Sequence, residues 1–206
     1  MPTIKPNDKV LHFSFDDVAF ARADVFAGSF SKKEIANKTF KPLETNLTTL
    51  PFKDKSFDFV MCSHVLQYVD NPPKIIDEVR RIAKTAQFIE HTEFAEYLFG
   101  WPTHKWIVCV ENNQMIIKPK NDRYGRFGPL FHGYYQNDPT FFDYAQANIG
   151  LFKIAVDWFE EDDETIDGKV KPVFRPCQTE YFDDLHYVIG DISRKIDVRH
   201  LKSKLL

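Results

Sequence analysis

Apolar residues in the middle of the chain follow two periods, one typical of a buried strand and one typical of an amphipathic helix. Residues 57–62 form a nearly continuous apolar run, as in a strand covered on both faces of a parallel sheet. Asn71 and Pro72 then predict a helix start, and apolar residues recur at helical spacing as far as residue 83. Residues 86–90 predict the next strand. The order of strand, helix and strand favours a right-handed crossover and a parallel pair.

The first part of the chain gives weaker signals. Residues 10–15 form a short apolar and aromatic run after a polar lead, which predicts a first strand, and residues 23–26 predict a second. Residues 29–39 are polar and contain lysines, which indicates a loop or a single helical turn. Together with the later strands, these segments predict an α/β fold, a doubly wound and mostly parallel sheet with helices on both faces.

The second half of the chain has a different character. Residues 106–110 and 114–117 flank a short polar turn, which predicts a hairpin inserted after the strand at residues 86–90. Residues 121–139 are rich in Gly, Pro and aromatic residues, so we expect a long ordered loop there. Asp138, followed by a proline, predicts the start of a helix that continues to residue 147.

The remaining segments complete one domain. Residues 151–159 predict a strand that pairs with residues 181–189 across an acidic loop, and the basic tail from residue 193 predicts a frayed or helical end. The chain has 206 residues and no internal repeat, which predicts a single domain over residues 1–206, of a size that would also suit excision from a longer polypeptide. With 43% apolar and 28% charged residues, the composition is that of a globular protein with a sizeable core.

Charge, hydropathy and cysteine content exclude several classes of partner. The formal net charge is −3, which does not supply the basic face of a nucleic-acid footprint, and no stretch approaches the 18 apolar residues of a membrane span. Cys62, Cys109 and Cys177 are odd in number and far apart, which favours a reducing compartment over a disulfide framework. We therefore expect a cytoplasmic protein with no nucleic-acid partner and no membrane span. The oligomeric state is left open.

Several histidines lie where a ligand could meet them. His64 and His91 directly follow predicted strands, so both are expected at the carboxyl edge of the sheet, where ligands bind in parallel sheets. His104 lies between two tryptophans, and His132 lies in another aromatic segment. His64 could contact the cofactor or acceptor, and His91 could remove a proton at neutral pH. His104 and His132 could act as a base or contact a sugar. The alternative for each is a structural histidine of a helix start or loop. The histidines do not show metal-ligand spacing, so no metal is expected.

One stretch, residues 50–72, combines several elements in a fixed order. They are Leu50-Pro51-Phe52, a polar turn, Ser56-Phe57-Asp58, an apolar strand, His64-Val65-Leu66 and an Asp70-x-Pro72 helix start. In this combination the stretch resembles the fourth-strand region of class I S-adenosylmethionine-dependent methyltransferases. The resemblance covers roughly residues 10–158. It implies a Rossmann-like fold, S-adenosylmethionine as cofactor and methyl transfer as the activity.

Two further segments resemble a small bacterial and viral subgroup of this family. Residues 94–106 contain the pattern Phe-Gly-Trp-Pro-x-His-Lys-Trp, and residues 126–132 contain Arg-Phe-Gly-x-Leu-Phe-His. Members of the subgroup are often found with enzymes of sugar and polysaccharide biosynthesis, so the resemblance implies a sugar or glycan acceptor. Between the two segments, Lys120, Arg123 and Arg126 could neutralise a phosphate or nucleotide-sugar group, or could form a solvated loop.

The positions that the resemblance assigns to the cofactor are altered in this chain. His12, Ser14 and Asp16 stand where the family has an acidic residue and a glycine-rich turn. Gly28 stands at the acid that holds the ribose hydroxyls, and Asn46 at the acid that receives the adenine amino group. An amide oxygen could still accept that hydrogen bond. The residues that the resemblance places near the cofactor are His12, Ser14, Asp16, Asn46, Ser63 and His64.

Two functions compete on this sequence. The first is methyl transfer to a sugar or glycan hydroxyl, with His91 or His104 as the base and with the acceptor oxygen positioned against the methyl group. The second is a catalytically inactive methyltransferase-like protein that serves as a binding or assembly partner. The loss of the glycine turn and of the ribose acid favours this second function. A carbohydrate- or nucleotide-binding module is a third and fainter alternative.

Overall fold

The computed structural model describes residues 4–15, 20–29, 38–111, 114–166, 169–172 and 174–176. Its elements are, in chain order, β1 (Val10–Ser14), β2 (Val25–Gly28), β3 (Thr39–Pro42), β4 (Phe57–Ser63), α2 (Pro72–Ile82), β5 (Ala83–His91), α3 (Glu93–Leu98), β6 (Trp106–Glu111), β7 (Gln114–Pro119), α4 (Gly128–Asn137), α5 (Pro139–Ala147), α6 (Ile149–Phe152), β8 (Lys153–Phe159), a short 3₁₀ turn η1 (Glu160–Asp162), β9 (Glu164–Ile166), β10 (Lys169–Lys171) and β11 (Phe174–Pro176).

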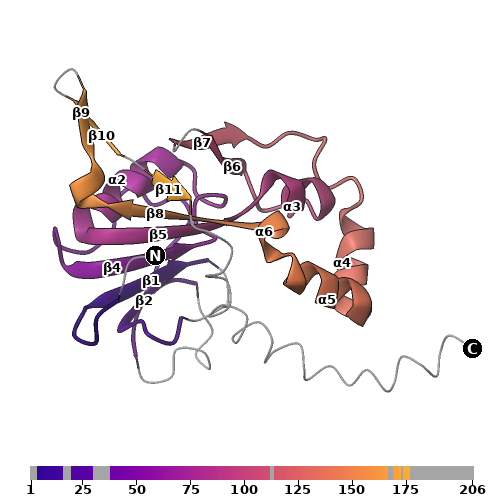
Figure 1. Cartoon of the computed structure of the whole chain (residues 1–206), viewed down its shortest axis with the longest axis horizontal. Coiled ribbons are helices and arrows are strands. Elements are labelled where there is room, and N and C mark those ends of the chain that lie inside the picture. The colour runs from indigo at the N-terminus through magenta and orange to yellow at the C-terminus, as the bar shows by residue number, and fades with distance from the viewer. Residues whose placement is uncertain are drawn as a thin grey trace, which may run out of the picture.

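The central sheet has the strand order β3-β2-β1-β4-β5-β8-β11 (Figure 1). The pairs from β3 to β5 are all parallel, whereas β8 runs antiparallel to both β5 and β11. From β1 the chain moves outward to β2 and β3, and from β4 it moves the other way to β5. The boundary between β1 and β4 is therefore the topological switch point, outside which ligands bind at the carboxyl ends of the strands.

Apolar side chains cover both faces of this sheet. On one face, α2 and the β6–β7 hairpin pack on a cluster that includes Val60 and Phe88. On the opposite face, Phe26 and Phe59 belong to a second cluster, against which α6 packs. The side chain of Asn71 caps α2 by accepting a hydrogen bond from the N–H of Lys74 at 3.2 Å. The helix thus begins where the sequence predicts it.

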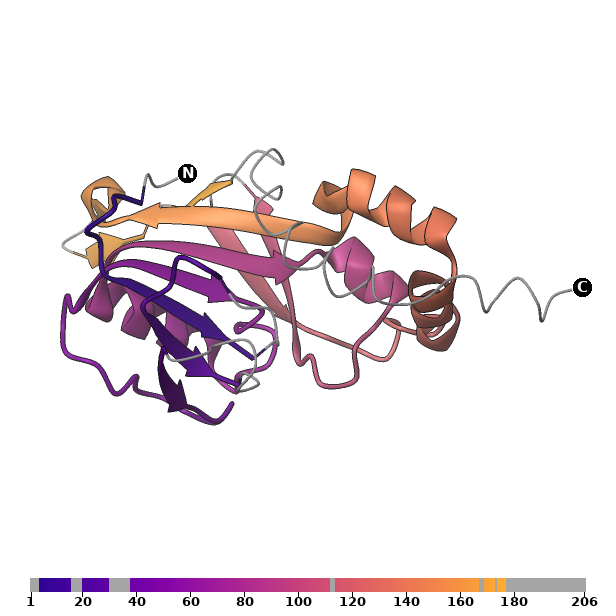
Figure 2. The same ribbon diagram turned by 90° about the horizontal axis from the view of Figure 1, so that it is seen from below.

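Helices α3 to α6 gather beyond the end of the sheet at which β5 ends (Figures 1 and 2). They share a small core of their own, formed by Ala95, Phe99, Ala145 and Phe152. Gly100 and Gly125 let two chain segments approach closely, because a Cβ on Gly100 would lie only 2.0 Å from the Cα of Gly125. Residues 94–106 and 126–132, which carry the subgroup patterns, also approach closely, because a Cβ on Gly128 would lie 2.4 Å from the carbonyl oxygen of Phe99.

Most predicted elements are confirmed. They are the strands at β1, β4, β5 and β8, the helices α2 and α5, the β6–β7 hairpin and the mostly parallel α/β sheet. The second strand begins at Val25 rather than at residue 23. The predicted pairing of β8 with residues 181–189, much of the segment 29–39 and the tail lie outside the described residues. Among the described residues, no helix has the length and apolar character needed to cross a membrane.

The prediction of a long loop over residues 121–139 is wrong. The helix α4 occupies most of its second half. The glycine, proline and aromatic content of this segment gives little helix propensity. Tertiary packing stabilises the helix instead, since the rings of Phe131 and Tyr135 contact the ring of Phe99 at centroid distances of 6.3 and 5.8 Å.

Candidate active site

The carboxyl ends of β1, β4 and β5 meet at one edge of the sheet. Ser14 and Ser63 are register partners on β1 and β4, and His91 ends β5. His64 follows β4 with a φ of 51°, and its N–H donates to the carbonyl oxygen of Ile89 at 2.7 Å. A non-glycine residue in the left-handed region is uncommon and costs on the order of 1–3 kcal/mol. The surrounding contacts therefore hold this turn in place.

Glu90 supplies part of that support. This buried residue of β5 accepts hydrogen bonds at one carboxylate oxygen from the N–H groups of Val65 and Leu66, at 3.2 and 2.9 Å. The turn after β4 is thus fastened to the neighbouring strand. As a result the rings of His64 and His91 lie against each other, with their centroids 4.2 Å apart.

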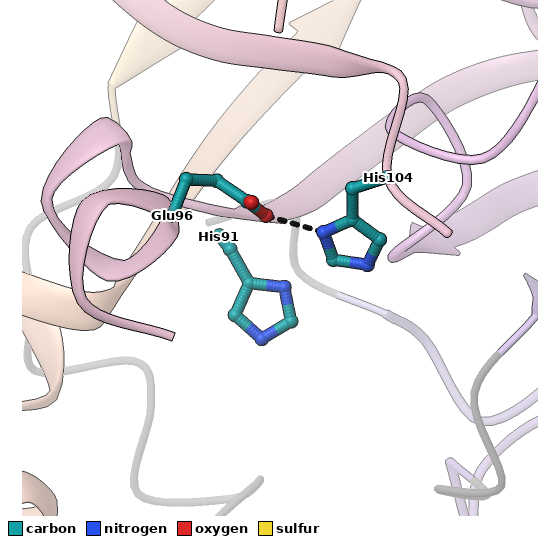
Figure 3. A group of neighbouring side chains, drawn as sticks. All are labelled: His91, Glu96 and His104. Carbon is teal, nitrogen blue, oxygen red and sulfur yellow. Dashed lines mark hydrogen bonds and ion pairs between the residues drawn. The ribbon is translucent and has the colours of Figure 1, made fainter. Parts of the chain in front are cut away.

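The helix α3 places a carboxylate against His104. The hydroxyl of Thr92 caps this helix by accepting from the N–H of Ala95 at 3.1 Å. Oε1 of Glu96 then contacts Nδ1 of His104, and both side chains are fully buried (Figure 3). A carboxylate at Nδ1 fixes the ring proton there, which leaves Nε2 as the nitrogen with the lone pair. This Nε2 is buried and has no hydrogen-bond partner among the residues that the structure describes.

Lys120 is a second charged neighbour of Glu96. Its ammonium lies 2.8 Å from Oε2 of Glu96 and donates to the carbonyl oxygen of Trp101 at 2.7 Å. Lys120 is therefore part of the site, whereas Arg123 and Arg126 are exposed as expected for a solvated loop. The carboxylate of Glu96 thus lies between an imidazole and an ammonium group.

Gln67 connects the two halves of this cluster. The residue is fully buried in the turn after β4. Its side-chain NH₂ donates to Oε1 of Glu96 at 3.3 Å, and its oxygen accepts from the backbone N–H of His91 at 3.0 Å. The positions of His91 and Glu96 are therefore coupled through one amide side chain.

Aromatic rings enclose the two histidines. The indole of Trp101 stacks on both imidazoles, with centroid distances of 4.1 Å to His91 and 5.2 Å to His104. The ring of Tyr68 meets His104 edge-on at 4.5 Å. His132 lies farther out, with its ring 5.6 Å from that of Trp101. The structure thus brings His64, His91 and His104 together and leaves His132 at the border of the group.

The sequence analysis missed Glu96 and Gln67, and it named Lys120 only as a candidate to neutralise a phosphate or nucleotide-sugar group. Glu96 lies in the first turn of a short helix, where acidic residues are common for reasons unrelated to catalysis. Gln67 follows a strand without a recognisable pattern, and the sequence has no signal for the contact between Lys120 and Glu96. No local signal could have found them, because each acquires its role through contacts with distant segments.

His12 is buried in the middle of β1. It is 1% exposed, its Nε2 is 2.7 Å from the hydroxyl oxygen of Ser63, and its Nδ1 accepts a hydrogen bond from the N–H of Phe20 at 3.1 Å. Burial lowers the pKa of His12 from 6.5 to about 3, so the imidazole is neutral. The pKa of His64 is also lowered well below 6.5, mainly by burial.

We expect this neutral imidazole to make the protein sensitive to acid. The unfolded chain binds a proton at His12 below pH 6.5, whereas the folded chain does not do so until about pH 3. Its contribution to stability is therefore complete above pH 6.5 and is lost as the pH falls from there toward 3. The loss at pH 5 is about 2 kcal/mol. Denaturant unfolding at pH 7 and pH 5 measures it, and the variant His12→Gln should show a smaller difference. An equal difference in the variant would contradict this assignment.

The other residues that the resemblance assigns to the cofactor do not form one cluster. Ser14 is buried at the end of β1, and Asn46 is exposed in a turn after β3. Asp16 lies outside the described residues. Gly28 has a φ of 111°, and a Cβ at this position would lie 1.9 Å from the carbonyl oxygen of Ser14. The chain thus requires glycine at the place where the resemblance puts the ribose acid.

Comparisons with known proteins found similarities over parts of the chain. Residues 13–89 match a family model described as a methyltransferase domain. Two curated relatives are uncharacterized proteins of Methanocaldococcus jannaschii. One is 49% identical over 35 residues, which are 17% of this chain and 17% of the relative, and the other is 37% identical over 73 residues, which are 35% and 24%. The chain thus spans no more than about a quarter of the length of the curated relatives it matches.

Solved structures also resemble this chain. The YcgJ protein from Bacillus subtilis is 19% identical with a TM-score of 0.37, over 47% of this chain and 54% of that structure. A structure titled as SAM-dependent methyltransferases from Methanosarcina mazei is 14% identical with a TM-score of 0.34, over 83% and 90%.

The sheet agrees with the fold that the resemblance implies. The mostly parallel sheet with its switch point between β1 and β4 is a Rossmann-like fold. The family match over residues 13–89 covers less than half of the chain and adds a similarity to a methyltransferase domain.

The edge at the switch point fits S-adenosylmethionine, the cofactor that the resemblance implies, in one respect and departs from it in another. Ser14, Gly28 and Ser63 lie at adjacent register positions at the carboxyl ends of β1, β2 and β4, so small side chains let a ligand come near the backbone. However, none of the three carries a carboxylate. Backbone and hydroxyl groups of this edge, together with His64, would therefore hold the cofactor.

Proposed function

We propose that this protein transfers a methyl group from S-adenosylmethionine to a hydroxyl group of a sugar or glycan. In this proposal the cofactor lies over Ser14, Ser63 and His64, and Asn46 meets its adenine. When bound, S-adenosylmethionine supplies an activated methyl group. His104, held by Glu96, removes the proton of the acceptor hydroxyl, and His91 lies beside it.

One observation carries this proposal, namely the buried pair of Glu96 and His104 at the carboxyl edge of the sheet. The carboxylate orients the imidazole and stabilises its charged form once it has taken a proton, as a base in an active site requires. The lone-pair nitrogen of the imidazole is buried and has no hydrogen-bond partner within the described part of the chain. Such a nitrogen can accept a proton from a hydroxyl placed within hydrogen-bond distance.

Exposed aromatic residues support a sugar acceptor. They belong to α3, α4, α5 and the loop before α4. These three helices lie at the end of the sheet where β5 ends (Figure 2). Flat apolar rings with polar edges suit the faces of sugar rings. The exposed fractions of these side chains lie between 45% and 56% for Phe94, Tyr97, Phe127, Tyr134 and Tyr144.

The first test is a calorimetric titration of the purified protein with S-adenosylmethionine and S-adenosylhomocysteine. We expect binding in the micromolar range, followed by transfer of a labelled methyl group to members of a panel of sugars, nucleotide sugars and polysaccharides. A folded protein that binds neither compound up to millimolar concentration would refute the proposal. That result would favour the catalytically inactive binding or assembly partner.

Two further expectations belong to this proposal. A single domain over residues 1–206 would contain both the cofactor edge and the acceptor region. The cytoplasm remains the expected location, since Cys62 and Cys109 are free cysteines and a reducing compartment suits them.

A further inference from the structure

We propose that His91, Glu96 and His104 bind a divalent metal ion of the zinc type. One ligand atom from each residue lies within 4.8 Å of the other two (Figure 3). The three residues come from the end of β5, from α3 and from the loop before β6. The catalytic meaning of this inference rests on the proposed function, whereas the binding site itself can be tested without methyl transfer.

The donor set suits such an ion. Two imidazoles and one carboxylate are the protein ligands of several catalytic zinc sites, in which a fourth position stays open. Ligand atoms around one zinc ion lie about 3.3 Å apart, from metal–ligand lengths of about 2.0–2.1 Å in a tetrahedron. Side-chain movements would bring the three atoms to this spacing, by opening the direct contact between Glu96 and His104 and by closing any wider separation. The ion would take the place of the proton that Glu96 and His104 share.

The surroundings also resemble those of a metal site. Gln67 donates to the carboxylate of Glu96 and accepts from the backbone of His91, so it holds two of the three ligands in orientation. Hydrogen bonds of this kind to ligating groups are a general feature of metal centres. His91 and Trp101 are only half-buried, whereas Glu96 and His104 are fully buried. The site therefore has one side on which an ion can enter.

The positive charge of Lys120 would repel a cation bound by Glu96, so a variant without this charge tests the site. Its ammonium group already neutralises Oε2 of Glu96 at 2.8 Å. A like charge near the bound ion weakens binding, so we expect an affinity below that of structural zinc sites. Removal of that charge in the variant Lys120→Gln should tighten metal binding about tenfold.

An ion in this place would serve the proposed reaction. Zinc lowers the pKa of an oxygen ligand in its open position. An acceptor hydroxyl bound there would give up its proton to water more readily. With the ion bound, His104 would serve as a ligand, whereas in the metal-free protein it is the base of the proposed function. The sequence did not predict this site, because its three ligands lie five and eight residues apart on separate elements.

Titration of the purified, metal-free protein with Co²⁺ tests the inference, with neither cofactor nor acceptor present. We expect one Co²⁺ per chain, visible absorption bands of a low-coordinate nitrogen and oxygen site, and loss of these bands on addition of Zn²⁺. His104→Gln and Glu96→Gln should weaken Co²⁺ binding at least tenfold. The matched control His132→Gln changes a neighbouring histidine outside the cluster and should bind as the wild type does.

Circular dichroism establishes that each variant is folded. If Glu96→Gln is unfolded, His104→Gln and Lys120→Gln still test whether the three residues bind the metal ion. Absence of Co²⁺ bands up to millimolar concentration, or identical bands in folded His104→Gln, would overturn the inference. Failure of methyl transfer would not, because the absorption bands report the metal alone.

Discussion

Replacement of His104 by alanine is expected to lower the rate of methyl transfer roughly a thousandfold, the usual contribution of a positioned general base. The variant removes the imidazole that Glu96 holds. Among the described residues, the other side chains in contact with this carboxylate are Gln67 and Lys120. Its affinity for S-adenosylhomocysteine should stay within a factor of a few, because the cofactor edge is formed by β1 and β4. Initial rates with a labelled methyl donor and calorimetry measure the two quantities separately.

A control variant and a double variant accompany this experiment. His132→Ala removes a histidine at the border of the aromatic group and should retain most of the activity. His91→Ala combined with His104→Ala should abolish transfer while cofactor binding persists. Appreciable turnover by this double variant would show that neither histidine removes the acceptor proton.

Replacement of Gly28 by aspartate is expected to destabilise the protein severely, although it restores the acidic residue that the family places there. The backbone at Gly28 has a φ of 111°, which side chains rarely tolerate, and the new Cβ would meet the carbonyl oxygen of Ser14 at 1.9 Å. Strained backbone alone costs on the order of 1–3 kcal/mol. With the collision added, the loss is a large share of the roughly 5–15 kcal/mol that stabilise a domain. Thermal unfolding and the yield of folded protein measure it.

Ser29→Asp is the matched control for this experiment. It adds the same charge one residue later, at an exposed position whose backbone N–H bonds to Ser14. We expect its unfolding temperature to stay close to that of the wild type. If Gly28→Asp unfolds at the wild-type temperature and binds S-adenosylmethionine more tightly, position 28 tolerates a side chain and this prediction is contradicted.

The sequence by itself determined the parallel core of the fold. The apolar run of β4, the capped helix α2 and the strand β5 each have local patterns that agree with their tertiary contacts, so periodicity was sufficient to find them. It also placed His64 and His91 at strand ends. Strands that run in parallel end at one edge, so the neighbourhood of these two histidines followed from their positions alone.

Only the tertiary structure decided the composition of the candidate site. Glu96 meets His104 because α3 turns back from the end of β5. Lys120 reaches Glu96 after the β6–β7 hairpin, where its backbone N–H donates to the carbonyl oxygen of Lys105. The helix α4, likewise, exists through packing on Phe99 rather than through its own propensity. Periodicity reports how a segment faces the core. The burial of a charged side chain against distant partners depends on contacts between segments, which no local pattern encodes.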